Sequence, residues 1–328
     1  MRTPARLRRS GVVLTAGAML LTGCGLGSAG GFVPSGKLSG AVSDVKPLNG
    51  AEIAIGSKNF TEQILLGKIA IIMLKSAGAT VTDLTNIPGS SSARQAQVQG
   101  DIQIMWEYTG TGWINYLGHT DPIPDERKQY VAVRDEDAKK NALRWLPSAP
   151  LNNTYGMAVK SSVAKKYGLN TMSDMKKVPQ AERTFCVESE FASRNDGFEP
   201  MLKKYGLPLG STIKKNQVKT LDTGAIYAAT GNGLCTFGEV FTTDGRIKAL
   251  NLKVLEDDKS YFPKYNASLV VANKTLEAYP QIKELFAPVA AKLTNNVLLE
   301  LNRQIDVDGR EPGDVAFDWL TKQGLITE

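Results

Sequence analysis

The residues after position 50 alternate between strand-like and helix-like hydrophobic patterns, and this alternation limits the fold more than any other sequence feature. In chain order the segments are a strand at 51–57, a helix at 63–76, a strand at 79–87, a helix at 91–100 and a strand at 101–108. This order favours a parallel sheet covered by helices, with ligands at the carboxyl ends of the strands. An aromatic-rich stretch, MWEYTGTGW at 105–113, lies at such an end. The sequence therefore predicts an α/β fold with a ligand site there.

A second α/β series begins near residue 152 and predicts a second lobe. It follows a charged helix at 126–143 and the proline-punctuated passage 145–150, which is typical of a crossing between domains. We expect lobe 1 to comprise residues 51–150 and 257–328, and lobe 2 to comprise residues 151–256. Two such lobes joined by two crossings would form a hinged clamshell.

The first 23 residues are predicted to be an export signal and not part of the fold. Four arginines precede the apolar run 11–21, which is too short to span a bilayer permanently. The run ends in Leu-Thr-Gly-Cys24, which resembles the bacterial lipobox, whose cysteine is diacylated; an ordinary signal peptide with a chance cysteine is the alternative. Residues 24–50 are rich in Gly and Ser and predict a flexible tether. We therefore expect a body held at the extracytoplasmic face of the cell membrane through Cys24.

The net charge and the cysteine content further limit the kind of protein that this chain can be. Removal of residues 1–23 takes away four arginines and no acidic residue, so the net charge of +6 falls to +2. So small a charge argues against nucleic acid as a partner. Cys186 and Cys235 lie in short strand-like runs of an exported chain, so a disulfide between neighbouring strands is one prediction and two buried free thiols the other.

The sequence is poorly equipped for catalysis, and we expect no enzyme, no cofactor and no metal site. The chain has one histidine, His119, in the loop LGHTDP, and no phosphate loop, dinucleotide fingerprint or metal-ligand spacing. Glu188 and Glu190 would share a face of a strand. Ion pairs at the rim of the site explain this pair of carboxylates as well as acid–base catalysis does. The rival from another class is a lipid-anchored serine hydrolase, with a nucleophile in Gly89–Ser92 and His119 as base. A third hypothesis is that the protein is a sensory or scaffolding lipoprotein.

Six short motifs occur along the chain in the order in which a known protein family has them. They are IGSKNFTEQ (55–63), EYTGTG (107–112), NNTYGMAV (152–159), RNDGFEPMLKKYG (194–206), TTDGRI (242–247) and LEDDKSYFPKYN (255–266). With these motifs the chain resembles the lipid-anchored substrate-binding proteins of ABC importers for osmoprotectants such as glycine betaine, carnitine or choline. The resemblance implies a periplasmic-binding-protein-like clamshell that presents its solute to a membrane permease driven by an ATPase.

Carried over motif by motif, the resemblance also implies the site residues. An aromatic cage falls on Tyr108, Tyr155, Phe241 and Tyr265, although betaine binders commonly have tyrosine where this chain has Phe241. That change keeps an aromatic face but loses the hydroxyl, so we expect a weaker or differently tuned cage. The tail-binding groups of the family fall on Lys58, Thr111 and Arg194, which closure of the lobes would bring onto one carboxylate. Each has an ordinary alternative: core aromatics, a solvated Lys58, or an Arg194 paired with Asp196 or Glu199.

The chemistry of a trimethylammonium head explains why such a cage is needed. The head carries a full positive charge but has no N–H to donate, so hydrogen bonds cannot select it. Aromatic faces can hold it, at about 0.5–1 kcal/mol for an exposed ring and about 2 kcal/mol when desolvated. Lys58 and Arg194 would serve little purpose for choline, which lacks a carboxylate, so they favour a zwitterion. We expect a solute like glycine betaine, and choline or carnitine is the alternative.

Overall fold

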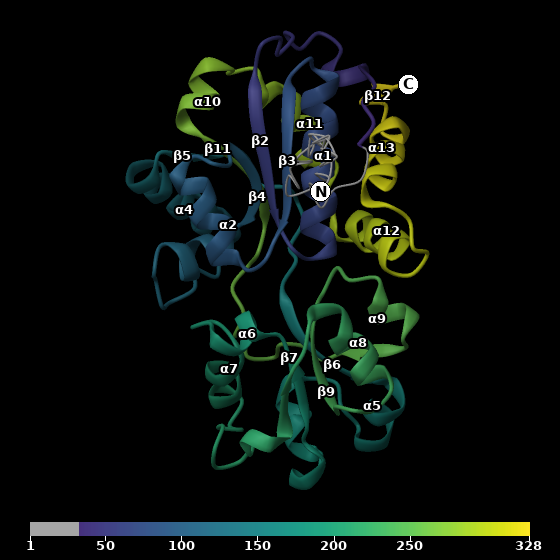
Figure 1. Ribbon diagram of the computed structural model, residues 1–328. Coiled ribbons are helices and arrows are strands. Elements are labelled where there is room, and N and C mark those ends of the chain that lie inside the picture. The colour runs from purple at the N-terminus through teal and green to yellow at the C-terminus, as the bar shows by residue number, and fades with distance from the viewer. Residues whose placement is uncertain (1–32) are drawn as a thin grey trace, which may run out of the picture.

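The structure, a computed structural model, describes residues 33–328 and contains two five-stranded sheets in two stacked lobes (Figure 1). The sheet of lobe 1 has the order β3-β2-β4-β11-β5. Its strands are β2 (Glu52–Lys58), β3 (Thr80–Ile87), β4 (Ile104–Tyr108), β5 (Leu143–Trp145) and β11 (Ala267–Ala272). The sheet of lobe 2 has the order β10-β6-β9-β7-β8. Its strands are β6 (Tyr155–Lys160), β7 (Phe185–Val187), β8 (Val218–Thr220), β9 (Phe237–Phe241) and β10 (Leu252–Val254).

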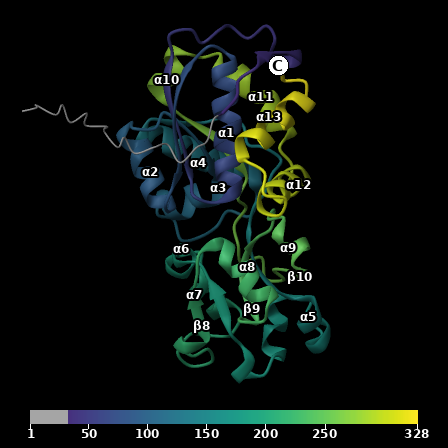
Figure 2. The ribbon, with the colours of Figure 1, turned by 45° about the vertical axis from the view of Figure 1, so that its right-hand side comes forward.

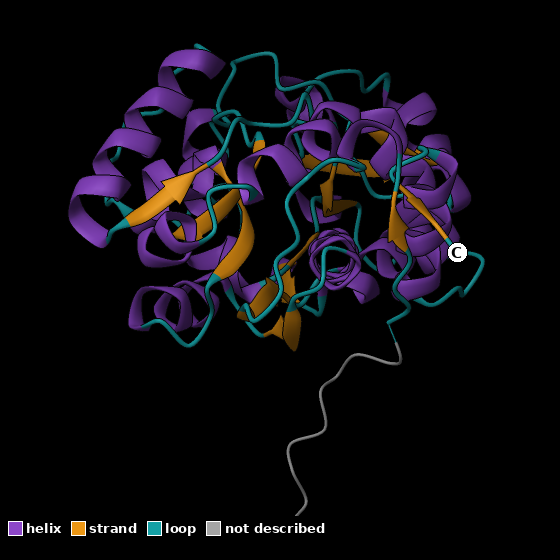
Figure 3. Ribbon diagram, turned by 90° about the horizontal axis from the view of Figure 1, so that it is seen from above, coloured by secondary structure: helices purple, strands orange, loops and turns teal. Residues whose placement is uncertain are grey.

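Helices cover the sheet of lobe 1, as Figure 3 shows from above. They are α1 (Thr61–Ser76), α2 (Ser90–Gln99), α3 (Thr109–Thr111), α4 (Glu126–Asn141), α10 (Asn273–Ala278), α11 (Ile282–Lys292), α12 (Asn295–Asp306) and α13 (Pro312–Lys322). Helix α1 is apolar on nearly every side and is buried along most of its length, because it packs against β2 and β3 on one side and α12 and α13 on another. The long run of apolar residues in this helix therefore belongs to the core of the lobe.

The sheet of lobe 1 is only partly parallel. Strand β2 pairs in parallel with β3 and β4, as the strand–helix alternation predicts. Strand β11, however, lies antiparallel between β4 and β5. It enters the sheet from lobe 2 after a crossing, so it runs against its neighbours and does not continue the strand–helix–strand pattern.

Lobe 2 has shorter elements and one covalent link. Its helices are α5 (Ser161–Tyr167), α6 (Ser189–Ser193), α7 (Phe198–Lys204), α8 (Thr223–Gly231) and α9 (Arg246–Ala249). Strand β7 is parallel to β8 and β9, whereas β6 is antiparallel to β9 and β10. Cys186 in β7 and Cys235, just before β9, form a disulfide, and both residues are buried. The disulfide therefore ties two neighbouring strands of this sheet together.

Two crossing segments join the lobes and run side by side. Asn152 and Asn266 form an isolated antiparallel bridge, and the N–H of Asn153 donates to the carbonyl of Tyr265 at 3.2 Å. The two-lobe α/β fold with two crossings is confirmed by these elements. Both crossings therefore pass next to each other, where a hinge between the lobes would bend.

The prediction of a flexible tether over residues 24–50 is wrong for residues 33–50. Strand β1 (Lys37–Leu38) pairs with β12 (Ile326–Thr327) at the C-terminus, beside α13 (Figure 2). The short helix η1 (Gly40–Val42) follows, and Val42 and Leu48 are fully buried. A few apolar side chains and one strand pair are enough to fix a Gly- and Ser-rich segment on the lobe. Residues 1–32, with the predicted export signal and Cys24, lie outside the described residues.

Among residues 33–328, no helix is long and apolar enough to cross a membrane.

Candidate functional site

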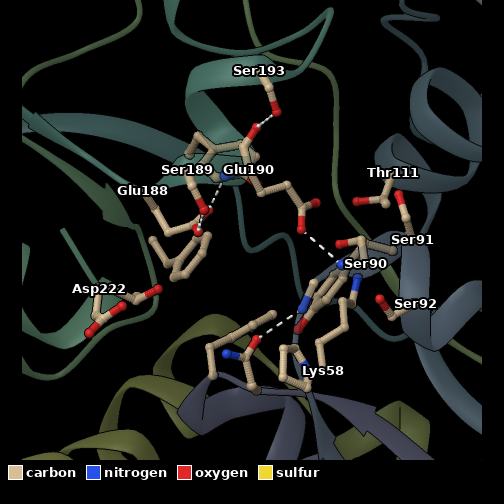
Figure 4. A pocket seen from close by; sticks show the side chains of 18 of the residues that line it. Lys58, Ser90, Ser91, Ser92, Thr111, Glu188, Ser189, Glu190, Ser193 and Asp222 are labelled. Carbon is tan, nitrogen blue, oxygen red and sulfur yellow. Dashed lines mark hydrogen bonds between the residues drawn. The ribbon is translucent and has the colours of Figure 1, made fainter. Parts of the chain in front are cut away.

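A cavity of about 790 Å³ lies between the lobes (Figure 4). Lobe 1 contributes the ends of β2 and β4 and the start of α2, and lobe 2 contributes α6, the start of α8 and the end of β9. Of the seven predicted site residues, six line this cavity: Lys58, Tyr108, Thr111, Tyr155, Phe241 and Tyr265. Arg194 is not among the lining residues. The carboxyl ends of β2 and β4 thus open onto the site, at the edge where the strand–helix alternation predicts a ligand.

Five aromatic rings meet on this cavity, and we call them the aromatic cluster: Phe60, Tyr108, Tyr155, Phe241 and Tyr265. The ring of Phe60 stacks on that of Phe241 across the cleft, with centroids 4.9 Å apart, and on Tyr108 at 6.2 Å. The Tyr155 ring lies 5.3 Å from Phe241 and 5.6 Å, edge-on, from Tyr265. Rings from both lobes and from a crossing segment therefore converge in one place.

Local backbone structure sets these rings in position. Tyr108 is the last residue of β4, and Tyr155, the first residue of β6, is the register partner of Phe241 at the end of β9. Tyr265 lies in the second crossing, against the turn that follows β4. A Cβ at Gly110 would lie 2.7 Å from Cδ1 of the Tyr265 ring and 2.9 Å from a carbonyl oxygen. Gly110 of the EYTGTG motif thus allows Tyr265 to approach the turn.

Glu62 in α1 lies beneath the cluster, is 2% exposed and connects the lobes. Its carboxylate accepts four hydrogen bonds: from Tyr108 Oη at 2.7 Å, Asn153 Nδ2 at 3.0 Å, Thr243 Oγ1 at 2.5 Å and Asn302 Nδ2 at 3.3 Å. Burial raises the pKa of Glu62, and these hydrogen bonds offset part of the rise. Thr243 belongs to lobe 2 and Asn302 to lobe 1, so the carboxylate is shared by both.

Lys58 faces the cavity but already has an anionic partner. Its ammonium lies 2.9 Å from Oε2 of Glu107, which is fully buried, and 5.0 Å from the centre of the Tyr108 ring. Glu107 also accepts from Tyr116 Oη at 2.7 Å. The interpretation of Lys58 as a solvated lysine is wrong, because the residue is only 3% exposed. Its charge is already compensated within lobe 1.

Arg194 is likewise held by carboxylates of the protein. Its Nε lies 2.6 Å from Oδ1 of Asp196 and its Nη2 2.8 Å from Oδ2, a two-pronged pair, while Nη1 lies 3.1 Å from Oε1 of Glu190. Asp196 in turn accepts from Tyr265 Oη at 2.6 Å. The pairing with Asp196, considered as an alternative from the sequence, is therefore present, and Arg194 fixes one ring of the aromatic cluster through it.

Glu188 and Glu190 do not share the face of a strand, contrary to the sequence-based prediction. Glu188 caps α6 and accepts from the N–H of Glu190 at 2.6 Å, whereas Glu190 lies within that helix. The carboxylate of Glu190 crosses the cleft, and its Oε2 accepts from the N–H of Ser90, the first residue of α2, at 2.8 Å. Burial alone would raise the pKa of Glu190, but the hydrogen bonds from Ser90 and the charges of Lys58 and Arg194 leave it lowered.

The hydrolase alternative is not supported by the geometry. The ring of His119 stacks on Trp113 with centroids 3.5 Å apart, and its Nε2 lies 2.8 Å from Glu136 Oε2. Ser90, Ser91 and Ser92 line the cavity, but His119 does not. The proposed nucleophile and base are therefore not brought together at the cavity.

Sequence reasoning missed Phe60, Glu62 and the role of Glu190. Phe60 was within reach, because it is the aromatic residue of the SKNFTEQ motif, between a strand end and a helix start. Glu62 follows in the same motif, but a carboxylate in the first turn of a helix is an ordinary feature. The contact of Glu190 with Ser90 joins residues of different lobes, and no local pattern marks it.

Comparison with known proteins assigns the family. A family model described as the substrate binding domain of ABC-type glycine betaine transport system matches residues 51–322. The chain belongs to this family. The resemblance carried by the six motifs is thereby confirmed, and proteins of this family are binding components that work with a permease and an ATPase.

This substrate-binding protein has relatives that match over most of their length. It is 36% identical over 284 residues to the glycine-betaine-binding protein of Pseudomonas aeruginosa, covering 84% of this chain and 89% of the relative. It is 32% identical over 287 residues to the glycine betaine-binding protein YehZ of Escherichia coli, covering 85% and 93%. A solved structure of a glycine betaine/carnitine/choline ABC transporter protein is similar with a TM-score of 0.67 at 29% identity, covering 82% of this chain and 98% of that one.

Proposed function

We propose that this protein is the extracytoplasmic receptor of an ABC importer and closes its lobes around a small quaternary ammonium solute, glycine betaine or a close analogue. The aromatic cluster carries the proposal, because it gathers rings from both lobes and a crossing segment on one cavity. Named relatives that bind glycine betaine or carnitine support the same class of ligand.

The methylated head would lie against the rings of the aromatic cluster, where it needs no hydrogen bond. Its positive charge would face the π-electrons of Tyr108, Tyr155 and Tyr265 and the face of Phe241. The tail would point towards Thr111, Lys58 and the start of α2, with Arg194 acting from behind Glu190. Because Lys58 and Arg194 are paired with protein carboxylates, a carboxylate tail would have to share them.

Cys24 is the proposed point of attachment to the membrane. In this view residues 1–23 are removed on export, and the new N-terminal cysteine carries the lipid. The folded body would then meet its permease at the extracytoplasmic face.

The test is calorimetric titration of the mature protein with glycine betaine, carnitine, choline and tetramethylammonium. Replacement of Tyr108 by Ala should weaken binding of the preferred solute at least about tenfold, because a desolvated ring contact is worth about 1.4 kcal/mol or more. Tyr108 is buried and hydrogen-bonded to Glu62, so Phe60→Ala, a half-buried ring without a polar partner, serves as the second variant.

The matched control is Tyr167→Ala, since Tyr167 lies on α5 outside the cavity and its hydroxyl donates to Glu182. It should bind as the wild type does. Unchanged affinity in folded Tyr108→Ala and Phe60→Ala proteins, or no binding of any quaternary ammonium solute to the wild type, would overturn the proposal.

A further inference from the structure

The carboxylate of Glu190 occupies a position that a ligand carboxylate would also favour. Its Oε2 accepts the N–H of Ser90 at the beginning of α2, a helix of 10 residues. The N-terminus of a helix attracts anions, because its first N–H groups have no partner within the helix and the helix dipole is positive there. Figure 4 shows this side chain reaching from lobe 2 to Ser90, with Ser91, Ser92 and Lys58 nearby.

The charges that line the cavity are unfavourable to a second carboxylate. Among the described lining residues, Glu188, Glu190 and Asp222 are acidic, and Lys58 is the one basic residue. Lys58 is already paired with Glu107, which does not line the cavity. Arg194 compensates part of the charge of Glu190 from outside the lining, but a carboxylate tail that entered here would still meet a lining with more acidic than basic side chains.

We propose that Glu190 determines which tail the site accepts: by occupying the start of α2 it disfavours carboxylate tails and favours tails that donate a hydrogen bond. This rests on the proposed quaternary ammonium site and narrows its ligand, because it moves the expected preference from glycine betaine towards a quaternary ammonium alcohol. A zwitterion such as glycine betaine must displace Glu190 from Ser90, which leaves Glu190 with Arg194 as its partner. A quaternary ammonium alcohol such as choline leaves that contact in place and can donate its hydroxyl to the carboxylate.

The experiment compares the dissociation constants of choline and glycine betaine for wild type and Glu190→Gln by calorimetry. The glutamine keeps the length and an acceptor oxygen for Ser90 but removes the charge. The ratio of the choline constant to the glycine betaine constant should rise about tenfold, since glycine betaine gains and choline loses. A ratio that stays within about twofold in the folded variant overturns the inference.

Asp222→Asn removes a negative charge from the same cavity wall, but Asp222 makes no contact across the cleft comparable to that between Glu190 and Ser90. The inference expects a clearly smaller change in the ratio than in Glu190→Gln. An equal change would overturn it, because general cavity charge and not the contact with α2 would then set the preference.

Tetramethylammonium, a head without a tail, separates this inference from the proposed function. If it binds the wild type and Phe60→Ala weakens that binding, the cage is established, and an unchanged ratio in Glu190→Gln defeats the inference alone. If the wild type binds none of glycine betaine, carnitine, choline and tetramethylammonium, the proposed function falls and the inference falls with it.

Discussion

Glu239 is a buried carboxyl group that is hydrogen-bonded to Glu188, one of the residues that line the cavity. It lies in β9, is 3% exposed, and its Oε2 accepts from the N–H of Glu188 at 2.7 Å. Burial raises its pKa to about 8; the hydrogen bond from the Glu188 N–H and the charge of Arg194 oppose the rise, and the charges of Glu188 and Glu190 add to it. This acid is therefore mostly protonated in the folded protein at neutral pH.

The raised pKa of Glu239 predicts that the protein loses stability as the pH rises. The folded state binds this proton more tightly than the unfolded state, so the contribution is complete below the usual value of 4.5 and is lost as the pH approaches about 8. The free energy of unfolding should fall by up to about 1.4 kcal/mol per pH unit in that window from this group. Glu239→Gln should remove that part of the slope in denaturant titrations at pH 5, 7 and 8.5.

A control for this prediction is Glu199→Gln, which removes an exposed carboxylate from α7 of the same lobe. Its unfolding free energies should run parallel to those of the wild type. If the unfolding free energies of Glu239→Gln also run parallel to those of the wild type, Glu239 is not the group that causes the loss of stability with rising pH.

For single residues, the sequence predicted which side chains lie at the site better than it predicted which side chains they contact. The family resemblance named five cavity residues in advance from their motifs: Tyr108, Thr111, Tyr155, Phe241 and Tyr265. The partners of Lys58 and Arg194 could not be fixed. Lys58 pairs with Glu107 on the neighbouring strand, a contact that depends on the register of β2 and β4 and not on any local spacing.

The short helix α3 and the crossing segment pack so closely that a single methyl group should disturb them. Gly110→Ala would place a Cβ within 3.0 Å of the Tyr265 ring and of the Lys264 carbonyl. The ring must move, which strains its hydrogen bond to Asp196. We expect a loss of about 1–3 kcal/mol in unfolding free energy and weaker solute binding.

The matched substitution is Gly231→Ala at the end of α8, where the nearest atom would be 3.4 Å away, an ordinary contact. It should keep both stability and affinity, measured by thermal unfolding and calorimetry. Equal losses in the two variants would mean that the approach of Tyr265 to Gly110 has no special importance.

Elements with a strong hydrophobic period were predictable from sequence, and elements fixed by distant contacts were not. The periodic pattern of residues 63–76 predicted α1, and alternation predicted β2 and β3. The sequence did not predict that β11 lies antiparallel between β4 and β5, because the hydrophobic pattern of a strand does not show in which direction the strand runs. The Gly- and Ser-rich composition of residues 24–50 predicts a flexible tether, but in residues 33–50 the burial of Val42 and Leu48 outweighs that local tendency.

In the whole molecule, contacts on two sides of the cleft join the lobes. On one side Thr243 donates to Glu62, Asn302 donates to the carbonyl of Thr243 at 3.0 Å, and Arg246 lies 3.6 Å from Asp306. On the other side Glu190 accepts from Ser90. With the aromatic cluster between them, these contacts exist only where the lobes meet, so we expect closure of the lobes and formation of the site to be the same event. The resemblance predicted that closure brings residues of both lobes together, but no local sequence pattern marks the particular contacts of Thr243 with Glu62 and of Glu190 with Ser90.

The pairing of β1 with β12 makes the described chain nearly circular. Because residues 37–38 and 326–327 are neighbours in one small sheet, a short Gly-Ser linker from Glu328 to Val33 should close it without strain. New ends opened between Asp121 and Pro122, both exposed, should give a circular permutant that still folds cooperatively and binds the same solute. Thermal unfolding and calorimetry would check this, and an unfolded permutant would mean that the continuous chain at residues 121–122 is needed. Its ends would emerge from lobe 1 at a new place, where reporter domains could be fused.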